Sequence, residues 1–200
     1  MSKGIFREII KPALILCIIC VFFSGALAFV NGVTKPIIDE NERIAHQESL
    51  KNVFADAREF SEGVGPEELK TKGYNVSERI AKIYEALKDG QPVGHVVEVS
   101  TRGYGGEIKM LVGIDNSMNI TGVVLTSHSE TPGLGAKGAE PGFRDQFLGP
   151  VPEKEFSVVK VAPRSDNEIQ AISGATVTSR AITNGVADAV ALVRSMSGGN

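Results

Sequence analysis

The feature that most constrains this chain is an uninterrupted apolar run near its N-terminus. Residues 12–30 contain no charged side chain, and a helix of that length, rising about 1.5 Å per residue, crosses the hydrocarbon core of a bilayer about once. Residues 26–28 resemble a signal-peptide cleavage site, but the run exceeds the usual apolar stretch of about 7–15 residues in such peptides. We therefore predict a retained membrane anchor in preference to a cleaved leader.

Charges on the two sides of this run predict its orientation. Lys3, Arg7 and Lys11 precede it against a single acidic residue, whereas several acidic residues follow it. Cytoplasmic flanks of membrane spans carry the excess of Lys and Arg, so the N-terminus should lie in the cytoplasm. We expect residues 1–33 to form a cytoplasmic N-terminus with a single transmembrane anchor in the cell membrane, and residues 34–200 to form an extracytoplasmic domain.

Composition argues against two classes of function. Lys and Arg number 21 against 24 Asp and Glu, which gives a net charge of −3, whereas nucleic-acid binding favours a strongly basic face. We therefore expect no nucleic-acid partner. The three histidines are scattered along the chain and no metal-binding motif accompanies them, so we expect no metal site.

Both cysteines, Cys17 and Cys20, lie inside the apolar run. Their C-x-x-C spacing elsewhere indicates redox or metal chemistry, but a thiol in hydrocarbon has no neighbour that lowers its pKa. We favour a packing role for both. The remaining chain contains no cysteine, and it must fold without disulfides.

Hydrophobic periodicity after the anchor predicts an α+β fold, in which an antiparallel sheet is flanked by helices. Residues 61–77 read as a loop with a short helical turn, and residues 127–152, rich in Gly and Pro, read as a long irregular segment. The other predicted elements are helices at 38–60 and 179–196 and strands at 80–87, 93–101, 108–114, 120–126 and 156–161.

Small and hydroxyl-bearing residues gather just before the last predicted helix, at Ser173, Gly174, Ala175, Thr176, Val177, Thr178 and Ser179. Small residues let a ligand approach the backbone closely, and a helix N-terminus attracts phosphate through its free N–H groups and its dipole. Ordinary helix capping explains the same composition. The residues alone therefore leave phosphate binding and plain capping both open.

This run, followed by an amphipathic helix, resembles the attachment motif of the FMN-binding domain family. That family includes the RnfG protein of the Rnf electron-transport complex and the NqrC protein of the sodium-pumping NADH:quinone reductase. The resemblance implies that a flavin transferase joins FMN to Thr176 through a phosphoester bond. It also implies phosphate-facing surroundings made by Ser173, Gly174, Ala175 and Thr178.

A second block, residues 130–135, supports the resemblance. It is similar to the family loop that lies against the isoalloxazine ring. It implies that Glu130 and the backbone amides near Gly133 and Gly135 bond ring heteroatoms, while Pro132 and Leu134 pack on the ring. In family members an Asp commonly precedes the acceptor Thr by six positions, where this chain has Gln170. The whole block is Glu130, Thr131, Pro132, Gly133, Leu134 and Gly135.

The resemblance covers nearly the whole chain and implies a function. It points to an electron-transfer subunit, without catalytic residues of its own, of a ferredoxin:NAD⁺ oxidoreductase that moves Na⁺ or H⁺ and whose other subunits are membrane proteins. The chain length favours this kind of subunit over the longer NqrC protein of the quinone reductase. Two further hypotheses are a free-standing membrane-anchored flavin-binding or sensing module and a structural assembly protein without cofactor.

Two residues near these motifs have alternative interpretations. His128 is either a proton donor near the flavin or, as we favour, a loop histidine that makes a structural hydrogen bond. Tyr104, in the glycine-rich link at 103–106, either stacks near the cofactor or packs as an ordinary aromatic side chain, which we favour.

Overall fold

One long helix forms the N-terminal part of the protein. The computed structural model describes residues 10–198, and in it α2 (Lys11–Val53) runs without interruption through Pro36. The apolar part of α2 is exposed, and the helix is long and apolar enough to cross a membrane. Lys3 and Arg7, on which the predicted orientation partly rests, lie outside the described residues.

The sequence predicts two separate helical segments, at 12–30 and 38–60, whereas the structure has one continuous helix, α2. Pro36 removes only one backbone hydrogen bond, and this helix continues on both sides of it. The predicted helix at 38–60 is wrong at its end, since α2 stops at Val53 and β1 (Glu59–Phe60) pairs with strand β2. The chain divides into two units, Met1–Ala45 and His46–Asn200.

The second unit is built on a six-stranded antiparallel meander with strand order β1-β2-β3-β4-β5-β6. Four long strands confirm the strands predicted at 80–87, 93–101, 108–114 and 120–126. Asp89 and Gly90 form the turn between the first two long strands and have positive φ angles of 50° and 77°. Such angles are typical of the tightest hairpin turns. The long strands are β2 (Ile80–Lys88), β3 (Gln91–Arg102), β4 (Glu107–Asp115) and β5 (Asn119–His128), and the edge strands are β1 and β6 (Gly149–Pro150).

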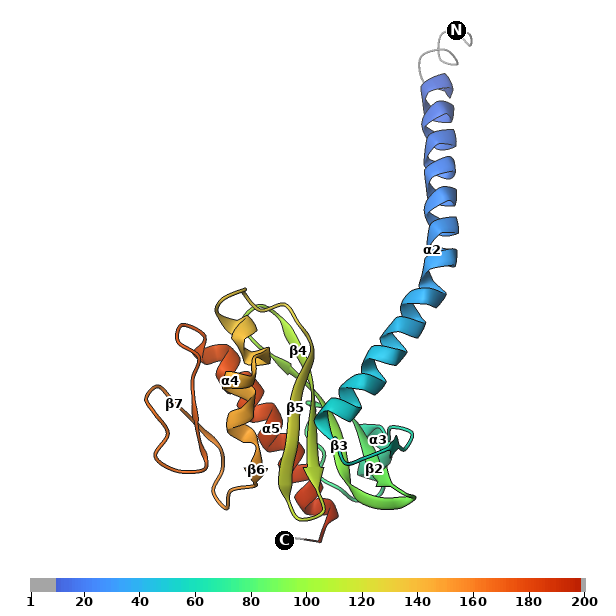
Figure 1. Cartoon of the computed structure of the whole chain (residues 1–200). Helices are drawn as coiled ribbons and strands as arrows, with labels where there is room; N and C mark the ends of the chain where they lie inside the picture. The colour runs from blue at the N-terminus through green and yellow to red at the C-terminus, as the bar shows by residue number, and fades with distance from the viewer. Residues whose placement is uncertain (1–9, 199–200) are drawn as a thin grey trace. The chain divides into compact units, whose positions relative to one another are not determined.

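Both faces of this sheet are covered, which explains why its strands are so apolar. Helix α5 (Thr176–Met196) packs along one face (Figure 1), where Met110 and Val112 of β4 meet Val186. On the other face, Leu111 of β4 joins the cluster that contains Val53 at the end of α2. Because side chains alternate along a strand, β4 supplies buried residues to both clusters.

The predicted irregular segment at 127–152 is more ordered than its composition suggests. It contains two short 3₁₀ helices, η2 (Gly135–Ala139) and η3 (Asp145–Phe147), on either side of α4 (Pro141–Arg144). Phe143 and Phe147 are buried and pack edge to face with ring centroids 5.7 Å apart. These two aromatic side chains fasten the segment to the main core.

Two smaller elements complete the unit. The short helical turn predicted within residues 61–77 is α3 (Pro66–Thr71). The strand predicted at 156–161 is β7 (Ser157–Val159), which pairs in parallel with β8 (Glu168–Gln170) as a separate two-stranded sheet. Strand β8 leads directly to the turn before α5.

Candidate functional site

The turn that leads into α5 is held by a hydroxyl from within the helix. The buried Ser179 side chain donates a hydrogen bond to the Ala175 carbonyl at 2.9 Å and accepts one from the Ile172 N–H at 3.0 Å. Gly174 has a φ of 76°, a left-handed conformation that favours glycine. Helix α5 therefore begins at Thr176, three residues earlier than the sequence predicts.

The segment at 130–135 forms a second tight turn. The carbonyl oxygen of Thr131 accepts hydrogen bonds from the N–H groups of Leu134 at 3.1 Å and Ala136 at 3.2 Å. Gly133 has a φ of 77°, so it also needs the freedom of glycine. The two turns are in contact at Gly174 and Leu134. A Cβ atom added to Gly174 would lie 3.2 Å from Leu134 Cδ2.

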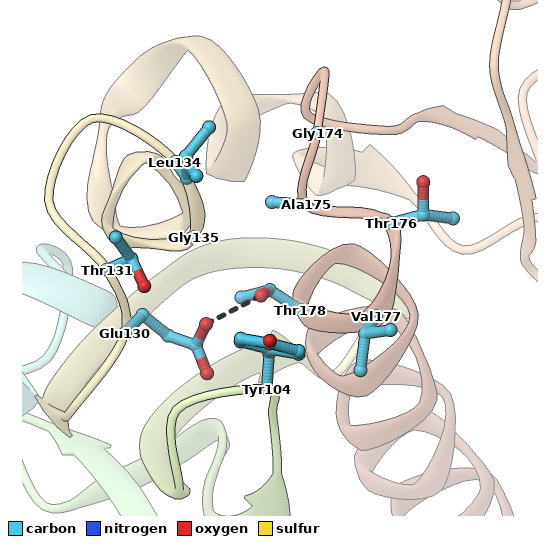
Figure 2. A pocket seen from close by; sticks show the side chains of 10 residues that line it. All are labelled: Tyr104, Glu130, Thr131, Leu134, Gly135, Gly174, Ala175, Thr176, Val177 and Thr178. Atoms are coloured by element: carbon cyan, nitrogen blue, oxygen red, sulfur yellow. Dashed lines mark hydrogen bonds between the residues drawn. The ribbon is translucent and has the colours of Figure 1, made fainter.

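A cavity of about 460 Å³ lies between these turns and the start of α5. Figure 2 shows the residues of the 130–135 segment on one side and those of the 174–178 segment on the other, with Tyr104 below. Pro132, Gly133 and Ser173 do not line this cavity, and Ser173 lines a second cavity of about 250 Å³ together with Gln170. The predicted residues that line the larger cavity are Glu130, Thr131, Leu134, Gly135, Gly174, Ala175, Thr176 and Thr178.

Glu130 is buried at the base of the cavity, with 6% of its surface exposed. Its Oε2 atom accepts a hydrogen bond from the Thr178 hydroxyl at 2.7 Å, as Figure 2 shows, and its Oε1 atom accepts one from the Gly105 N–H at 2.9 Å. Each oxygen therefore already has a protein donor. A carboxylate oxygen has two lone pairs, so a further donor would add to these bonds.

Tyr104 and Val177 also line the cavity, although the sequence analysis did not assign them to it. Tyr104 is 77% exposed, so the preferred interpretation of it as an ordinary packing aromatic was wrong. It lies in the link between β3 and β4, which the Gly105–Glu130 bond ties to the cavity. No local motif shows that pairing, since the two residues are separated in sequence by two strands.

His128 takes the structural role that we favoured. Its Nδ1 atom accepts the N–H of Glu130 at 3.4 Å, and it is not among the residues that line the cavity. The histidine thus helps to shape the start of the 130–135 turn. In Figure 2 the base of the cavity is made by Glu130, Thr178 and Tyr104.

The first turn of α5 provides a favourable environment for an anion. The N–H groups at the start of any α-helix lack partners within the helix, and the helix dipole places partial positive charge there. Here Ala175 precedes the helix without a side-chain cap, and no acidic residue lies in the first turn. A phosphate near Thr176 would therefore meet N–H donors that lack a side-chain cap, although the Glu130 carboxylate is bonded to Thr178 in the same turn.

Comparison with known proteins agrees with this geometry. Residues 103–191 match the FMN-binding domain, and residues 1–53 match the RnfG N-terminal region. The first of these matches spans both turns of the cavity, and the second spans α2. The two parts of the chain therefore point to the same group of proteins.

Relatives match along almost the whole chain. It is 34% identical over 198 residues to the RnfG protein of the Na⁺-translocating ferredoxin:NAD⁺ oxidoreductase complex of Acetobacterium woodii, covering 96% of this chain and 95% of that protein. It is 32% identical to the corresponding protein of the proton-translocating complex of Clostridium ljungdahlii, covering 92% and 91%.

Among solved structures, the NqrC protein of the Na⁺-translocating NADH-quinone reductase from Parabacteroides distasonis has the same fold. The TM-score is 0.52 at 21% identity, over 77% of this chain and 92% of that one. The extent and identity of the sequence relatives decide the assignment. The chain belongs to the FMN-binding domain family and, within it, to the RnfG proteins of ion-translocating oxidoreductase (Rnf) complexes.

Proposed function

We propose that this protein carries FMN esterified to Thr176 and relays electrons as the RnfG component of an ion-translocating ferredoxin:NAD⁺ oxidoreductase in the cell membrane. The observation behind the proposal is the position of Thr176, which is the first residue of α5 and lines the cavity opposite the 130–135 turn. A flavin phosphate joined at this place would lie at the helix N-terminus, beside a cavity for the ring.

Exposure distinguishes Thr176 from the neighbouring hydroxyls. Thr178 is fully buried and donates to Glu130, and the buried Ser179 hydroxyl is bonded on two sides. Ser173 is exposed but lines the other cavity. The Thr176 side chain is partly exposed and, within residues 10–198, its hydroxyl has no hydrogen-bond partner. Of the four, only Thr176 combines access with contact to the larger cavity.

The residues present fit FMN in size and in chemistry. A volume of about 460 Å³ falls within the range of about 300–1,000 Å³ typical of pockets for small cofactors. Leu134 and Val177 are 44% and 54% exposed and supply apolar surface for a flat ring, with the Tyr104 ring beside them. The first turn of α5 supplies N–H donors for the phosphate.

The bound flavin would supply the chemistry of accepting and donating electrons, and the chain would supply position and retention. A phosphoester prevents loss of a cofactor that, outside the cytoplasm, cannot easily be recovered. Helix α2 would hold the domain in the same bilayer as its redox partners, which raises their effective concentration. We place the N-terminus in the cytoplasm and the FMN-binding domain outside it. A flavin transferase would be the partner of this chain during maturation.

Substitution of the acceptor hydroxyl tests this proposal. The full chain is produced in its own host, denatured and examined for flavin fluorescence in the separated protein band. We expect fluorescence from the wild type and from Thr176→Ser, which keeps a hydroxyl, and none from Thr176→Ala. Ser173→Ala serves as the matched control and should stay fluorescent, because its hydroxyl lines the other cavity. A fluorescent Thr176→Ala band would refute the proposed attachment site.

A further inference from the structure

The buried carboxylate of Glu130 connects three parts of the chain that are far apart in sequence. We propose that Glu130 is the positioning residue of this cavity: it fastens the 130–135 turn and the β3–β4 link to the first turn of α5. What this does to the flavin rests on the proposed function, whereas the fastening itself concerns only residues of this chain.

The bonds of Glu130 span every wall of the cavity. Thr178 belongs to α5, Gly105 belongs to the link between β3 and β4, and Glu130 itself begins the turn that carries Leu134. All three of these segments also contribute lining residues. Because the three segments have no other hydrogen bond to one another among the described residues, the carboxylate is the polar junction of the cavity.

The environment of the carboxylate makes these bonds strong. Thr178 is completely buried, and in the part of the chain that the structure describes no Lys or Arg forms an ion pair with Glu130. A buried carboxylate without a cation depends on its hydrogen-bond donors, and charge-assisted hydrogen bonds are stronger than neutral ones. Loss of either donor would therefore be costly.

Glycines leave only one place for this side chain. A Cβ atom on Gly103 would collide with Glu130 Oε1, and one on Gly135 would collide with Oε2 and lie 2.8 Å from Thr178 Oγ1. A Cβ atom on Gly105 would collide with the carbonyl oxygen of Ser129. The glycines of the 103–106 link and of the 130–135 turn thus leave the space that the carboxylate occupies. Binding of a flavin ring alone would not require glycine at these positions.

The consequence for the cavity follows from the contact between its two turns. Leu134 lies against Gly174, and among residues 10–198 its backbone bonds only to Thr131 and Lys137, on its own side of the cavity. If the carboxylate is removed, the 130–135 turn loses its bond to α5 and opens more often. A flavin held at Thr176 by a single ester would then be less enclosed and would adopt more orientations.

Glutamine separates geometry from charge at this position. In Glu130→Gln, the amide oxygen can accept the Gly105 N–H while the amide nitrogen donates to the Thr178 hydroxyl, because a hydroxyl accepts as well as donates. Glu130→Gln therefore keeps both connections, Glu130→Ala keeps neither, and Thr178→Val removes only the bond to α5. Glu107→Gln is the matched control, since Glu107 is an exposed glutamate that bonds Ser100 outside the cavity.

Amide hydrogen exchange of the full chain in detergent tests the fastening. The variants are made in a Thr176→Ala background, so that the result does not depend on flavin. We expect amides of residues 131–139 to exchange roughly tenfold faster in Glu130→Ala, with an intermediate rate in Thr178→Val. Glu107→Gln should stay near the parent, and Glu130→Gln, which keeps both connections through weaker neutral bonds, should exchange much more slowly than Glu130→Ala. Equal rates in Glu130→Ala and Glu107→Gln, or equally fast exchange in Glu130→Gln and Glu130→Ala, would overturn the proposal.

A second readout uses the Thr176-containing chain with its flavin. Quenching of flavin fluorescence by iodide and the visible circular dichroism of the ring both report its enclosure. Glu130→Ala should be quenched several-fold more readily than the wild type, with a weakened dichroism band, and Glu130→Gln should restore both. If the wild type carries no FMN by mass, the proposed function fails while the exchange result stands. If the wild type carries FMN and Glu130→Ala is unchanged in both readouts, the positioning role alone fails.

Discussion

At the scale of single residues, neighbouring hydroxyls in one short segment have different tasks. Thr176 is accessible at the cavity, Thr178 is buried and bonded to Glu130, and Ser179 holds the turn that precedes them. A run of Ser and Thr in the sequence therefore does not describe equivalent groups. Their hydrogen bonds distinguish Thr176, the hydroxyl that we propose carries FMN, from the bonded hydroxyls of Thr178 and Ser179.

Ser179 should be needed for the turn rather than for the chemistry. Ser179→Ala removes a bond from the Ile172 N–H and a bond to the Ala175 carbonyl, which should lower the free energy of unfolding by about 1–3 kcal/mol. It should also reduce the flavin-to-protein absorbance ratio, since Thr176 follows the loosened turn. Thermal unfolding and the absorbance ratio measure the two effects. The exposed Ser173→Ala is the control, and a Ser179→Ala protein as stable as this control would contradict the assignment.

Tyr84, on the other face of the sheet, should make the protein sensitive to alkali. Its hydroxyl donates to Glu98 at 3.0 Å and lies 3.2 Å from His46 Nε2. Burial, and secondly the charge of Glu98, raise the pKa of Tyr84 well above its ordinary value of 10.0. The folded state then holds a proton that the unfolded chain releases, so this contribution is present below about pH 10 and is lost as the pH rises further.

Tyr84→Phe removes this dependence. Between about pH 9 and pH 11 the wild type should lose more stability than Tyr84→Phe. At neutral pH Tyr84→Phe should be less stable by about 1–2 kcal/mol, because Glu98 loses its donor. Denaturant unfolding across this pH range measures both. Parallel pH profiles for the two proteins would show that Tyr84 does not titrate in this way.

At the scale of elements, the end of α2 fits closely on the sheet. The Val53 carbonyl accepts the Thr121 hydroxyl at 2.8 Å, and a Cβ atom on Gly122 would lie 2.6 Å from that carbonyl oxygen. On the next strand, a Cβ atom on Gly113 would lie 2.7 Å from Val53 Cγ1. Glycines on β4 and β5 thus create the space that receives the last turn of the helix.

Gly122→Ala should disturb this fit. The added methyl group overlaps backbone atoms of Val53 that cannot move independently, so we expect a loss of about 1–3 kcal/mol in the free energy of unfolding. Gly142→Ala is the control, since nothing lies within 4 Å of its added Cβ atom. Thermal unfolding of both variants is the measurement, and equal melting temperatures would argue against close docking.

Elements with a strong local pattern were predictable from the sequence, and those that depend on distant partners were not. The four long strands and most of α5 carry their own hydrophobic period. Strands β1 and β6 are two residues each and exist only through pairing with a neighbour. Helix α5 begins earlier than expected because Ser179, which reads as a capping residue, bonds backwards from inside the helix.

The cavity residues within local motifs were predictable from the sequence, and the contacts between distant segments were not. Two sequence motifs gave most residues of the cavity, because each motif is local. For Tyr104 the less favoured alternative fits the cavity better, and the bonds of Glu130 were missed, since they join segments that only the folded sheet brings together. Pro132 and Gly133 shape the turn but do not line the cavity, which a sequence motif does not distinguish.

At the scale of the whole molecule, the chain combines an apolar helix with the cavity in which we propose that FMN is held, and this combination suits electron transfer at a membrane. If the relay is correct, a complex that contains Thr176→Ala should assemble and co-purify normally but lose NAD⁺ reduction by ferredoxin. Thr176→Ser should retain it. Full activity in a complex without this flavin would contradict the relay, and a chain that never co-purifies with membrane redox subunits would favour a free-standing flavin module.

Mass analysis of one peptide tests the central claim most directly. Trypsin should release residues 165–180, which contain Thr176 together with Ser165, Ser173, Thr178 and Ser179. For protein isolated from its own host, we predict that this peptide carries FMN less one water and that fragmentation places the addition on Thr176. A bare peptide, or an addition on another of these hydroxyls, would contradict the account.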